Sequence, residues 1–315
     1  MQQVTASVES PPLRWYQGLS RYQWWVFTVG AMAWLFDCTD QRLFMLARSP
    51  ALSDLLGGLS QSDPRVVNYA TYATAATMAG WGIGGLFFGI LGDRWGRAKT
   101  MGLSVLVYSL FTGLCGVATG GVDFCFYRFL MGAGIGGAFA TAAALIAETV
   151  PPHSRPVLMG LFSALSLFGN MSGSVLAGLF HPDARYGAGW FGGEGIAGWR
   201  LLFFVGAGPA FLVVLIIRTL RESEQWLAAR REARDSGAAQ LGDLRVLWID
   251  RRWRRSTGVA ISLATAGIVG VWGVGFWSPE LISEALAGIG KTKIAEVRAR
   301  GTILQDIGGF LGILT

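Results

Sequence analysis

The chain contains 315 residues, of which 52% are hydrophobic and only 15% are charged. Soluble domains carry about 25% charged residues, so this composition excludes an ordinary soluble fold. The net charge of +6 does not indicate a nucleic-acid partner, because the basic residues are spread over polar segments that flank apolar runs, as the topology signals of a membrane protein are.

The apolar residues fall in blocks of roughly 20, the length that a helix needs to cross about 30 Å of hydrocarbon. Because lipid offers the backbone no hydrogen-bond partners and the runs are continuous, they predict helices and not barrel strands. The fold class predicted is therefore an all-α polytopic membrane protein. The seven predicted spans are Tyr22–Ala47, Asn68–Leu91, Thr100–Thr119, Val122–Ala147, Val157–Phe180, Trp199–Arg218 and Thr257–Pro279.

The two ends of the chain need separate comment. A signal peptide is an alternative for the first run, but Asp37 and Asp40 interrupt its far end and no small-residue cleavage site follows, so we expect a retained span. An eighth run begins near Gly301 and reaches Thr315. About 15 residues rise only roughly 22 Å, so we expect the sequence to stop inside a helix.

One long polar segment, from Arg221 to Arg255, separates the sixth and seventh runs. It predicts three parts: a six-helix transmembrane bundle (1–220), a cytoplasmic linker (221–256) and the start of a second bundle (257–315). Six-helix repeats joined by a central loop are a recurring carrier architecture, with the substrate site between the halves. We expect that this fragment alone does not transport.

Basic residues set the expected orientation, since positively charged loops stay in the cytoplasm. With the N-terminus inside, the arginine-rich linker and the loop around Arg97 are cytoplasmic, and the external loops are poorer in Lys and Arg apart from Lys291 to Arg300. We therefore predict a multi-pass protein of the cell (inner) membrane with a cytoplasmic N-terminus. We expect a monomer within the lipid bilayer.

The cysteines and histidines predict no metal chemistry. Cys38, Cys115 and Cys125 form neither a C-x-x-C pair nor a metal spacing, and His153 and His181 fall in loops on opposite sides of the predicted membrane. No nucleophile with a base lies at one membrane depth. We expect no cofactor and no enzymatic activity.

The most specific motif joins the second and third spans and runs from Gly89 to Lys99, with the letters GILGDRWGRAK. Gly89 and Gly96 allow a tight turn and close helix approach, and Asp93 can meet Arg97 or the positive end of a neighbouring helix. As an alternative, Arg94 and its basic neighbours act only as topology signals. The ordered spacing resembles G-x-L-x-D-R-x-G-R, the signature of the major facilitator superfamily of secondary carriers.

That resemblance implies alternating access, and two further loops extend it. Glu148-Thr-Val-Pro leads to Arg155, and Glu222-Ser-Glu-Gln-Trp-Leu follows the sixth span. Both are similar to loops of the sugar porter and aromatic-acid:proton symporter branches, except that Glu224 replaces the usual proline. The residues that the resemblance assigns to conformational gating are Gly89, Asp93, Arg94, Gly96, Arg97, Glu148, Arg155 and Glu222.

The fourth span carries Arg128 and a run of glycines. The glycines fit the G-x-G-x-x-G dinucleotide pattern, but that fingerprint needs a preceding strand, so close packing of membrane helices explains them better, as it does Gly85-x-x-x-Gly89. An arginine within a span usually faces a partner or an aqueous cavity; the alternative is snorkelling to the interface. The predicted packing glycines are Gly132, Gly134, Gly136 and Gly137.

Asp37 and Asp40 lie in the outer half of the first span, three residues apart and hence on one helical face. They match the two acids of the D-G-F-D motif in the aromatic-acid symporter branch, although Cys38 and Thr39 depart from it. Burial and mutual repulsion disfavour two charges here, which is the chemistry of proton exchange. Arg128 could bind a substrate carboxylate or pair with an aspartate. Alternatively, Asp40 lies at the interface and Asp37 only hydrogen-bonds a neighbouring helix.

Together these features predict a secondary transporter whose partners are protons and a small-molecule substrate. The span-five stretch Gly169 to Ser174 lacks the proline of the drug antiporters, which favours symport of a small organic, possibly aromatic, acid. A sugar or polyol porter shares the loop motifs and remains an alternative. A membrane sensor that binds the solute without moving it is an alternative of another class.

Overall fold

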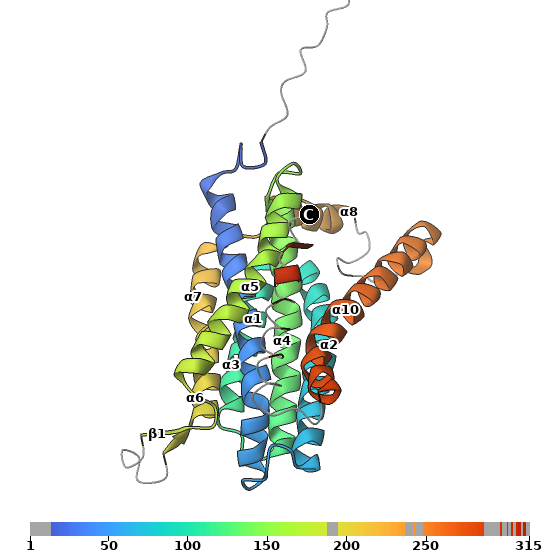
Figure 1. Cartoon of the computed structure of the whole chain (residues 1–315). Helices are drawn as coiled ribbons and strands as arrows, with labels where there is room; N and C mark the ends of the chain where they lie inside the picture. Colours follow the sequence, from blue (N-terminus) through green and yellow to red (C-terminus); the bar gives the residue numbers. More distant parts are fainter. Residues whose placement is uncertain are drawn as a thin grey trace, which may run out of the picture.

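The computed structural model describes residues 14–187, 195–236, 242 and 248–286, with single positions after them (297, 301, 304, 307–309, 311 and 312). The predicted eighth span lies largely outside these residues. Long helices standing side by side dominate the described chain (Figure 1). They are α1 (Arg21–Leu55), α2 (Pro64–Trp95), α3 (Arg97–Cys115), α4 (Gly121–Thr149), α5 (Arg155–Leu179), α6 (Gly198–Gly206), α7 (Ala210–Thr219), α8 (Glu224–Ser236) and α10 (Arg251–Ala285).

Five segments of the described residues are long and apolar enough to cross a membrane: α2, α3, α4, α5 and the α6–α7 pair taken together. This agrees with the polytopic all-α prediction. The helix α1 falls short of that standard because its second half holds Asp37, Asp40 and Arg42. It nevertheless packs along α5 and α4 inside the bundle (Figure 1).

Several predicted boundaries are corrected by the structure. The first helix continues through Pro50 to Leu55, and the second extends to Trp95, where Gly96 (φ +114°) makes the turn into α3. Most of the signature segment is thus helix and not loop. The predicted sixth span is interrupted between α6 and α7, because Pro209 has no N–H to continue the helical ladder.

Two short elements lie outside the helices of the bundle. Strands β1 (Arg185–Tyr186) and β2 (Ile196–Ala197) form an antiparallel hairpin that the apolar pattern did not predict. The linker after α7 contains the helix α8. We call the end of the bundle where α1 begins and α2 passes into α3 the Arg97 end, and the opposite end the hairpin end (Figure 1).

The interior consists of two apolar clusters stacked along the bundle. One, towards the Arg97 end, includes Val26, Met101 and Ile146; the other, towards the hairpin end, includes Phe124 and Trp199. The helix α4 packs along α2 and α3 and provides side chains to both. The buried stretch of α1 from Asp37 to Gln41 lies where one cluster passes into the other.

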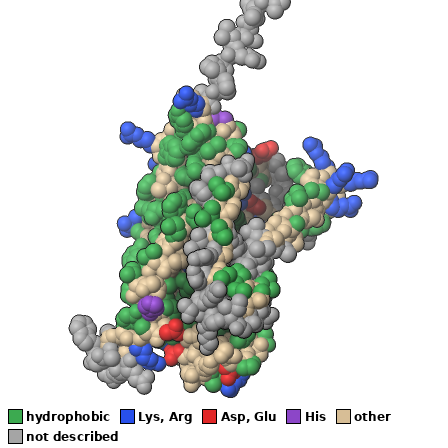
Figure 2. Space-filling model, in the orientation of Figure 1, with side chains coloured by type: hydrophobic (Ala, Val, Ile, Leu, Met, Phe, Trp, Pro, Cys, Tyr) green, Lys and Arg blue, Asp and Glu red, His purple; other side chains and the backbone are tan. Residues whose placement is uncertain are grey.

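The outer faces of α2 and α5 are apolar and exposed in the described chain. Figure 2 shows apolar side chains over much of the flank of the bundle and basic side chains at the tip of α10. The exposed apolar residues include Ile83, Leu86 and Phe87 on α2 and Phe168, Met171 and Val175 on α5. Such a surface fits contact with lipid or with further apolar helices and not with water.

Candidate functional site: a buried charge cluster and a cluster at the Arg97 end

Two carboxylates of α1 lie on the same face of the helix, inside the bundle. Asp37 and Asp40 are each 1% exposed. Their separation of three residues stacks them on one side of the helix. Both carboxylates are therefore enclosed by protein, and their depth in the membrane stays a prediction.

Arg128 of α4 meets this pair and is itself 0% exposed. Its Nη1 lies 3.4 Å from Oδ2 of Asp40, and its Nε donates to the hydroxyl of Thr77, 3.3 Å away. The guanidinium carbon is 3.8 Å from the centre of the Phe44 ring, a cation–π contact. Arg128 therefore faces partners within the protein and does not snorkel to the interface.

The central cluster, by which we mean Asp37, Asp40 and Arg128, is incompletely satisfied. Among the described residues, neither oxygen of Asp37, nor Oδ1 of Asp40, nor Nη2 of Arg128 has a hydrogen-bond partner. With both carboxylates ionised, its formal charge is −1. An unpaired charge in a dry interior is costly, so the charges balance only when one proton or one further cation joins the cluster.

A small cavity of about 20 Å³ adjoins Arg128 on the side away from α3. Its polar wall is made by Arg128, Thr77 and Gln41, and its apolar wall includes Phe44 and Trp81. This volume holds roughly one water-sized group. A guanidinium and aromatic rings border this space, but in this conformation it is too small for a ring that carries a carboxylate.

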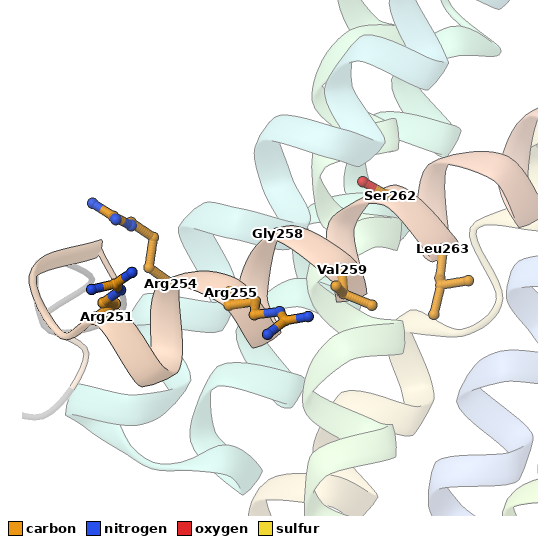
Figure 3. Close-up of a pocket in the computed structure, with 7 residues that line it drawn as sticks. All are labelled: Arg251, Arg254, Arg255, Gly258, Val259, Ser262 and Leu263. Atoms are coloured by element: carbon orange, nitrogen blue, oxygen red, sulfur yellow. The ribbon is translucent and has the colours of Figure 1, made fainter.

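A larger hollow of about 670 Å³ lies elsewhere, along the beginning of α10. Figure 3 shows its lining residues spaced along this one helix, with Arg251, Arg254 and Arg255 followed by Gly258, Val259, Ser262 and Leu263. All of them belong to α10. A surface lined by a single helix does not converge on a ligand, so we do not take this hollow as the site.

The second group of charges holds the Arg97 end together. Arg97 contacts Asp93 at 2.5 Å (Nη1 to Oδ1) and Glu148 at 3.0 Å (Nε to Oε1). The other oxygen of Glu148 accepts a hydrogen bond of 2.5 Å from Ser223. One arginine thus ties the end of α2 to the end of α4, and Glu148 ties α4 to the segment before α8.

Glu222 fastens the same segment to the start of α3. Its carboxylate accepts from the backbone N–H groups of Ala98 (3.1 Å) and Lys99 (3.2 Å), where the helix dipole favours a negative charge. A Cβ at Gly96 would overlap this carboxylate, and the positive φ there also requires glycine. The indole of Trp226 donates to the carbonyl of Asp93 at 2.7 Å.

The other predicted gating residues are Gly89, Arg94 and Arg155. Gly89 lies within α2, where a Cβ would meet no atom within 4 Å. Arg94 is exposed near the end of α2, and Arg155 begins α5. The role of these three residues in gating stays a prediction.

The glycines of α4 lie against α2 and α3. A Cβ at Gly132 or Gly136 would overlap backbone atoms of α2, and one at Gly134 or Gly137 would come within 2.5 Å of an atom of α3 or α2. On α2, Gly80 and Gly84 pack against the backbone of α4, and the predicted Gly85 lies next to Gly136, whereas a Cβ at the predicted Gly89 would meet no atom within 4 Å. We call this contact of Gly80, Gly84, Gly132 and Gly136 the α2–α4 glycine contact.

Sequence reasoning missed several members of both clusters. Thr77 and Phe44 contact Arg128, yet neither belongs to a charged motif. Ser223 contacts Glu148 and lies in the motif that begins at Glu222, but no role was assigned to it. The spacing Gly80-x-x-x-Gly84 offered a further signal for the close contact of α2 with α4. The other partners follow from the fold alone.

Known proteins resemble the chain over most of its length. The sequence profile of the Major Facilitator Superfamily matches residues 30–312. The cis,cis-muconate transport protein of Acinetobacter baylyi is 29% identical over 67% of this chain and 48% of its own length. The gentisate transporter of Corynebacterium glutamicum is 29% identical over 69% of this chain and 46% of its own. The chain thus spans about half the length of these curated relatives, which are named as transporters and not enzymes.

A solved structure shows the same fold. The structure of XylE, the proton:xylose symporter from E. coli, bound to 6-bromo-6-deoxy-D-glucose, matches 93% of this chain and 69% of its own with a TM-score of 0.65. The sequence identity is 18%, so the likeness concerns the fold and not the substrate.

Proposed function

Because the chain belongs to the Major Facilitator Superfamily, we propose that it is the N-terminal portion of a secondary transporter that takes up a small organic acid together with protons. The proposed division is a six-helix bundle over 1–220, a linker over 221–256 and the start of a second bundle from 257. Aromatic acids are the leading substrate class, as carried by the gentisate transporter to which the chain is similar. The similar muconate transporter carries an acyclic organic acid.

The charge imbalance of the central cluster carries the proposal. Asp37 and Asp40 together with Arg128 leave one negative charge in a dry interior. A proton bound by one carboxyl removes it. Intramembrane carboxylates of this kind mark proton relays in transporters, and the proton would be the coupling ion.

Arg128 is the proposed anchor for the substrate carboxylate. Its pair with Asp40 is long at 3.4 Å, and its Nη2 has no partner among the described residues. A carboxylate in the adjoining cavity would compete with Asp40 for the guanidinium, and bidentate pairing would favour the substrate. Protonation of Asp40 would weaken its hold on Arg128, which links proton binding to substrate binding.

The proposed orientation places the N-terminus and the Arg97 end in the cytoplasm of the cell that carries the protein in its inner membrane. Arg97 with Asp93, Glu148 and the Glu222 segment would then close the cytoplasmic side, and opening would separate the ends of α2 and α4 from the segment before α8. Such contacts suit a gate because each is made by partly exposed charges and breaks at low cost.

A sugar or polyol porter is the second candidate, favoured by the fold shared with XylE and by the loop around Glu222. In that case the carboxylates would accept hydrogen bonds from substrate hydroxyls. Uptake would then discriminate against anions.

The test is uptake into liposomes that contain the full-length protein under an imposed pH gradient, with labelled aromatic acids, aliphatic acids and sugars. We expect accumulation of an acid that Asp37→Asn abolishes while membrane insertion stays intact. Asp235→Asn, which alters an exposed carboxylate of α8, serves as the matched control. Full accumulation by Asp37→Asn would remove that residue from coupling, and uptake of sugars alone would establish the second candidate.

A further inference from the structure

The helix α3 presents three hydroxyl groups to the interior of the bundle at the level of the central cluster. Tyr108, Ser109 and Thr112 are all 0% exposed. Among the described residues, none of the three hydroxyls makes a hydrogen bond of standard geometry. We call them the α3 hydroxyls.

These hydroxyls and the two carboxylates border the same space. Tyr108 lies within electrostatic range of both Asp37 and Asp40 and close to the hydroxyl of Ser109, and Thr112 lies close enough to Asp40 for a weak, poorly aligned hydrogen bond. A Cβ built on Gly206 of α6 would touch Cγ2 of Thr112 at 3.0 Å and Oδ1 of Asp40 at 3.2 Å. The unpartnered Oδ1 of Asp40 therefore lies on the side of Thr112, while Oδ2 is on the side of Arg128.

Hydroxyls in helices usually bond back to a carbonyl one turn earlier. This chain follows that rule at Thr141, whose Oγ1 donates to the carbonyl of Gly137 at 2.7 Å, and at Ser104, which donates to the carbonyl of Thr100 at 2.8 Å. Ser109 and Thr112 do not, and the phenol of Tyr108 is too long to make such a bond. A buried hydroxyl without a well-made hydrogen bond is costly, so three together on one face need a reason.

The proposed competition between a substrate carboxylate and Asp40 for Arg128 provides such a reason. When a substrate carboxylate takes Arg128, Asp40 loses its ion-pair partner and needs other donors. A hydroxyl can donate to a carboxylate and can also accept from a protonated carboxyl, so it serves either protonation state. Guanidinium cannot do this, because it has no acceptor.

We propose that Tyr108, Ser109 and Thr112 are positioning residues that take over Asp40 from Arg128 and support Asp37 beside it, and so set the pH at which the protein binds and releases its proton. This inference rests on the proposed function. The charged and titratable groups that face the pair are Cys38 on α1, Tyr108 and Cys115 on α3, and Arg128 on α4. The helix α5, which packs along α1, carries no titratable side chain after Arg155.

The test measures initial uptake of the acid against pH with the full-length protein in liposomes. Hydrogen bonds donated to a carboxylate favour its ionised form. Loss of a donor in Tyr108→Phe or Thr112→Val should therefore move the midpoint of the pH profile upward, by about 0.5 to 1 pH unit. Thr112→Ser retains the hydroxyl and should keep the wild-type midpoint. Thr141→Val, a buried hydroxyl with its own partner, is the matched control.

Thermal unfolding of the same variants separates this role from a structural one. Because the Tyr108 hydroxyl makes no hydrogen bond of standard geometry among the described residues, Tyr108→Phe should leave the Tm nearly unchanged or raise it while the pH midpoint moves. An unchanged midpoint in both Tyr108→Phe and Thr112→Val, with Asp37→Asn still inactive, overturns the inference and leaves the proposed function standing. Proton-driven uptake by Asp37→Asn would overturn both.

Discussion

The central cluster and the cluster at the Arg97 end use the same kinds of residue in opposite ways. Asp37, Asp40 and Arg128 are dry, form one long ion pair and leave four polar atoms without partners among the described residues. At the Arg97 end, Arg97 is 17% exposed and Glu148 21%, and each meets two partners. The fully paired, partly exposed charges at the Arg97 end hold the helix ends together. The buried central cluster, with unpaired polar atoms, can respond to the binding of a proton or a ligand.

The largest effect should follow loss of the single cation in the central cluster. Arg128→Met leaves two buried carboxylates without a counter-charge, which should lower the free energy of unfolding by about 3–5 kcal/mol. Thermal unfolding in detergent would report a large fall in Tm. Adding Asp40→Asn should recover part of the loss. If Arg128→Met alone were as stable as wild type, water would have to reach the two carboxylates.

A smaller effect is expected when the Arg97 end loses its bridge. Arg97→Gln breaks the contacts with Asp93 and Glu148, which are partly exposed, so we expect a loss of about 1–2 kcal/mol. Turnover should slow while substrate affinity is retained, as measured by uptake and equilibrium binding. Lys99→Gln is the control, since Lys99 contacts Glu222 only through its backbone N–H.

Salt sharpens the contrast between these two variants. At 1 M salt the Debye length is about 3 Å, which screens partly exposed pairs and leaves buried ones nearly unaffected. High salt should therefore reduce the difference in the free energy of unfolding between wild type and Arg97→Gln. If high salt reduced the difference between wild type and Arg128→Met equally, the central cluster could not be shielded from the solvent.

The smallest effect should come from Glu222→Gln. The amide oxygen can still accept from the N–H of Ala98 or Lys99, and only the charge at the helix start is lost, so we expect less than about 1 kcal/mol. Proteolysis of the segment before α8 would detect its looser attachment. A loss as large as that of Arg97→Gln would mean that Glu222 and not Arg97 holds this end closed.

Much of the fold followed from the sequence because lipid permits few backbone solutions. Blocks of about 20 apolar residues can only be helices, and the structure has helices over all seven predicted spans. The errors lie at helix ends. The apolar pattern stops at Leu91, but α2 continues to Trp95 since nothing before Gly96 breaks the ladder. The pair Gly208-Pro209 is a signal for the break between α6 and α7, but the apolar pattern continues across it without interruption.

Only the charged residues of the candidate site could be predicted from the sequence. Charged residues within apolar runs stand out, so Asp37, Asp40 and Arg128 could be found by composition. Thr77, Tyr108 and Thr112 are common residues in membrane helices, and nothing in their spacing shows that the helices α2 and α3 turn them towards α1 and α4. Their relevance depends on contacts between segments far apart in the chain.

The α2–α4 glycine contact restricts how this half of the protein can move. At Gly80, Gly84, Gly132 and Gly136, backbone lies on backbone with no side chains between to rearrange. Sliding or tilting one helix on the other would bring atoms into overlap, so this contact favours movement of α2 and α4 as one rigid body.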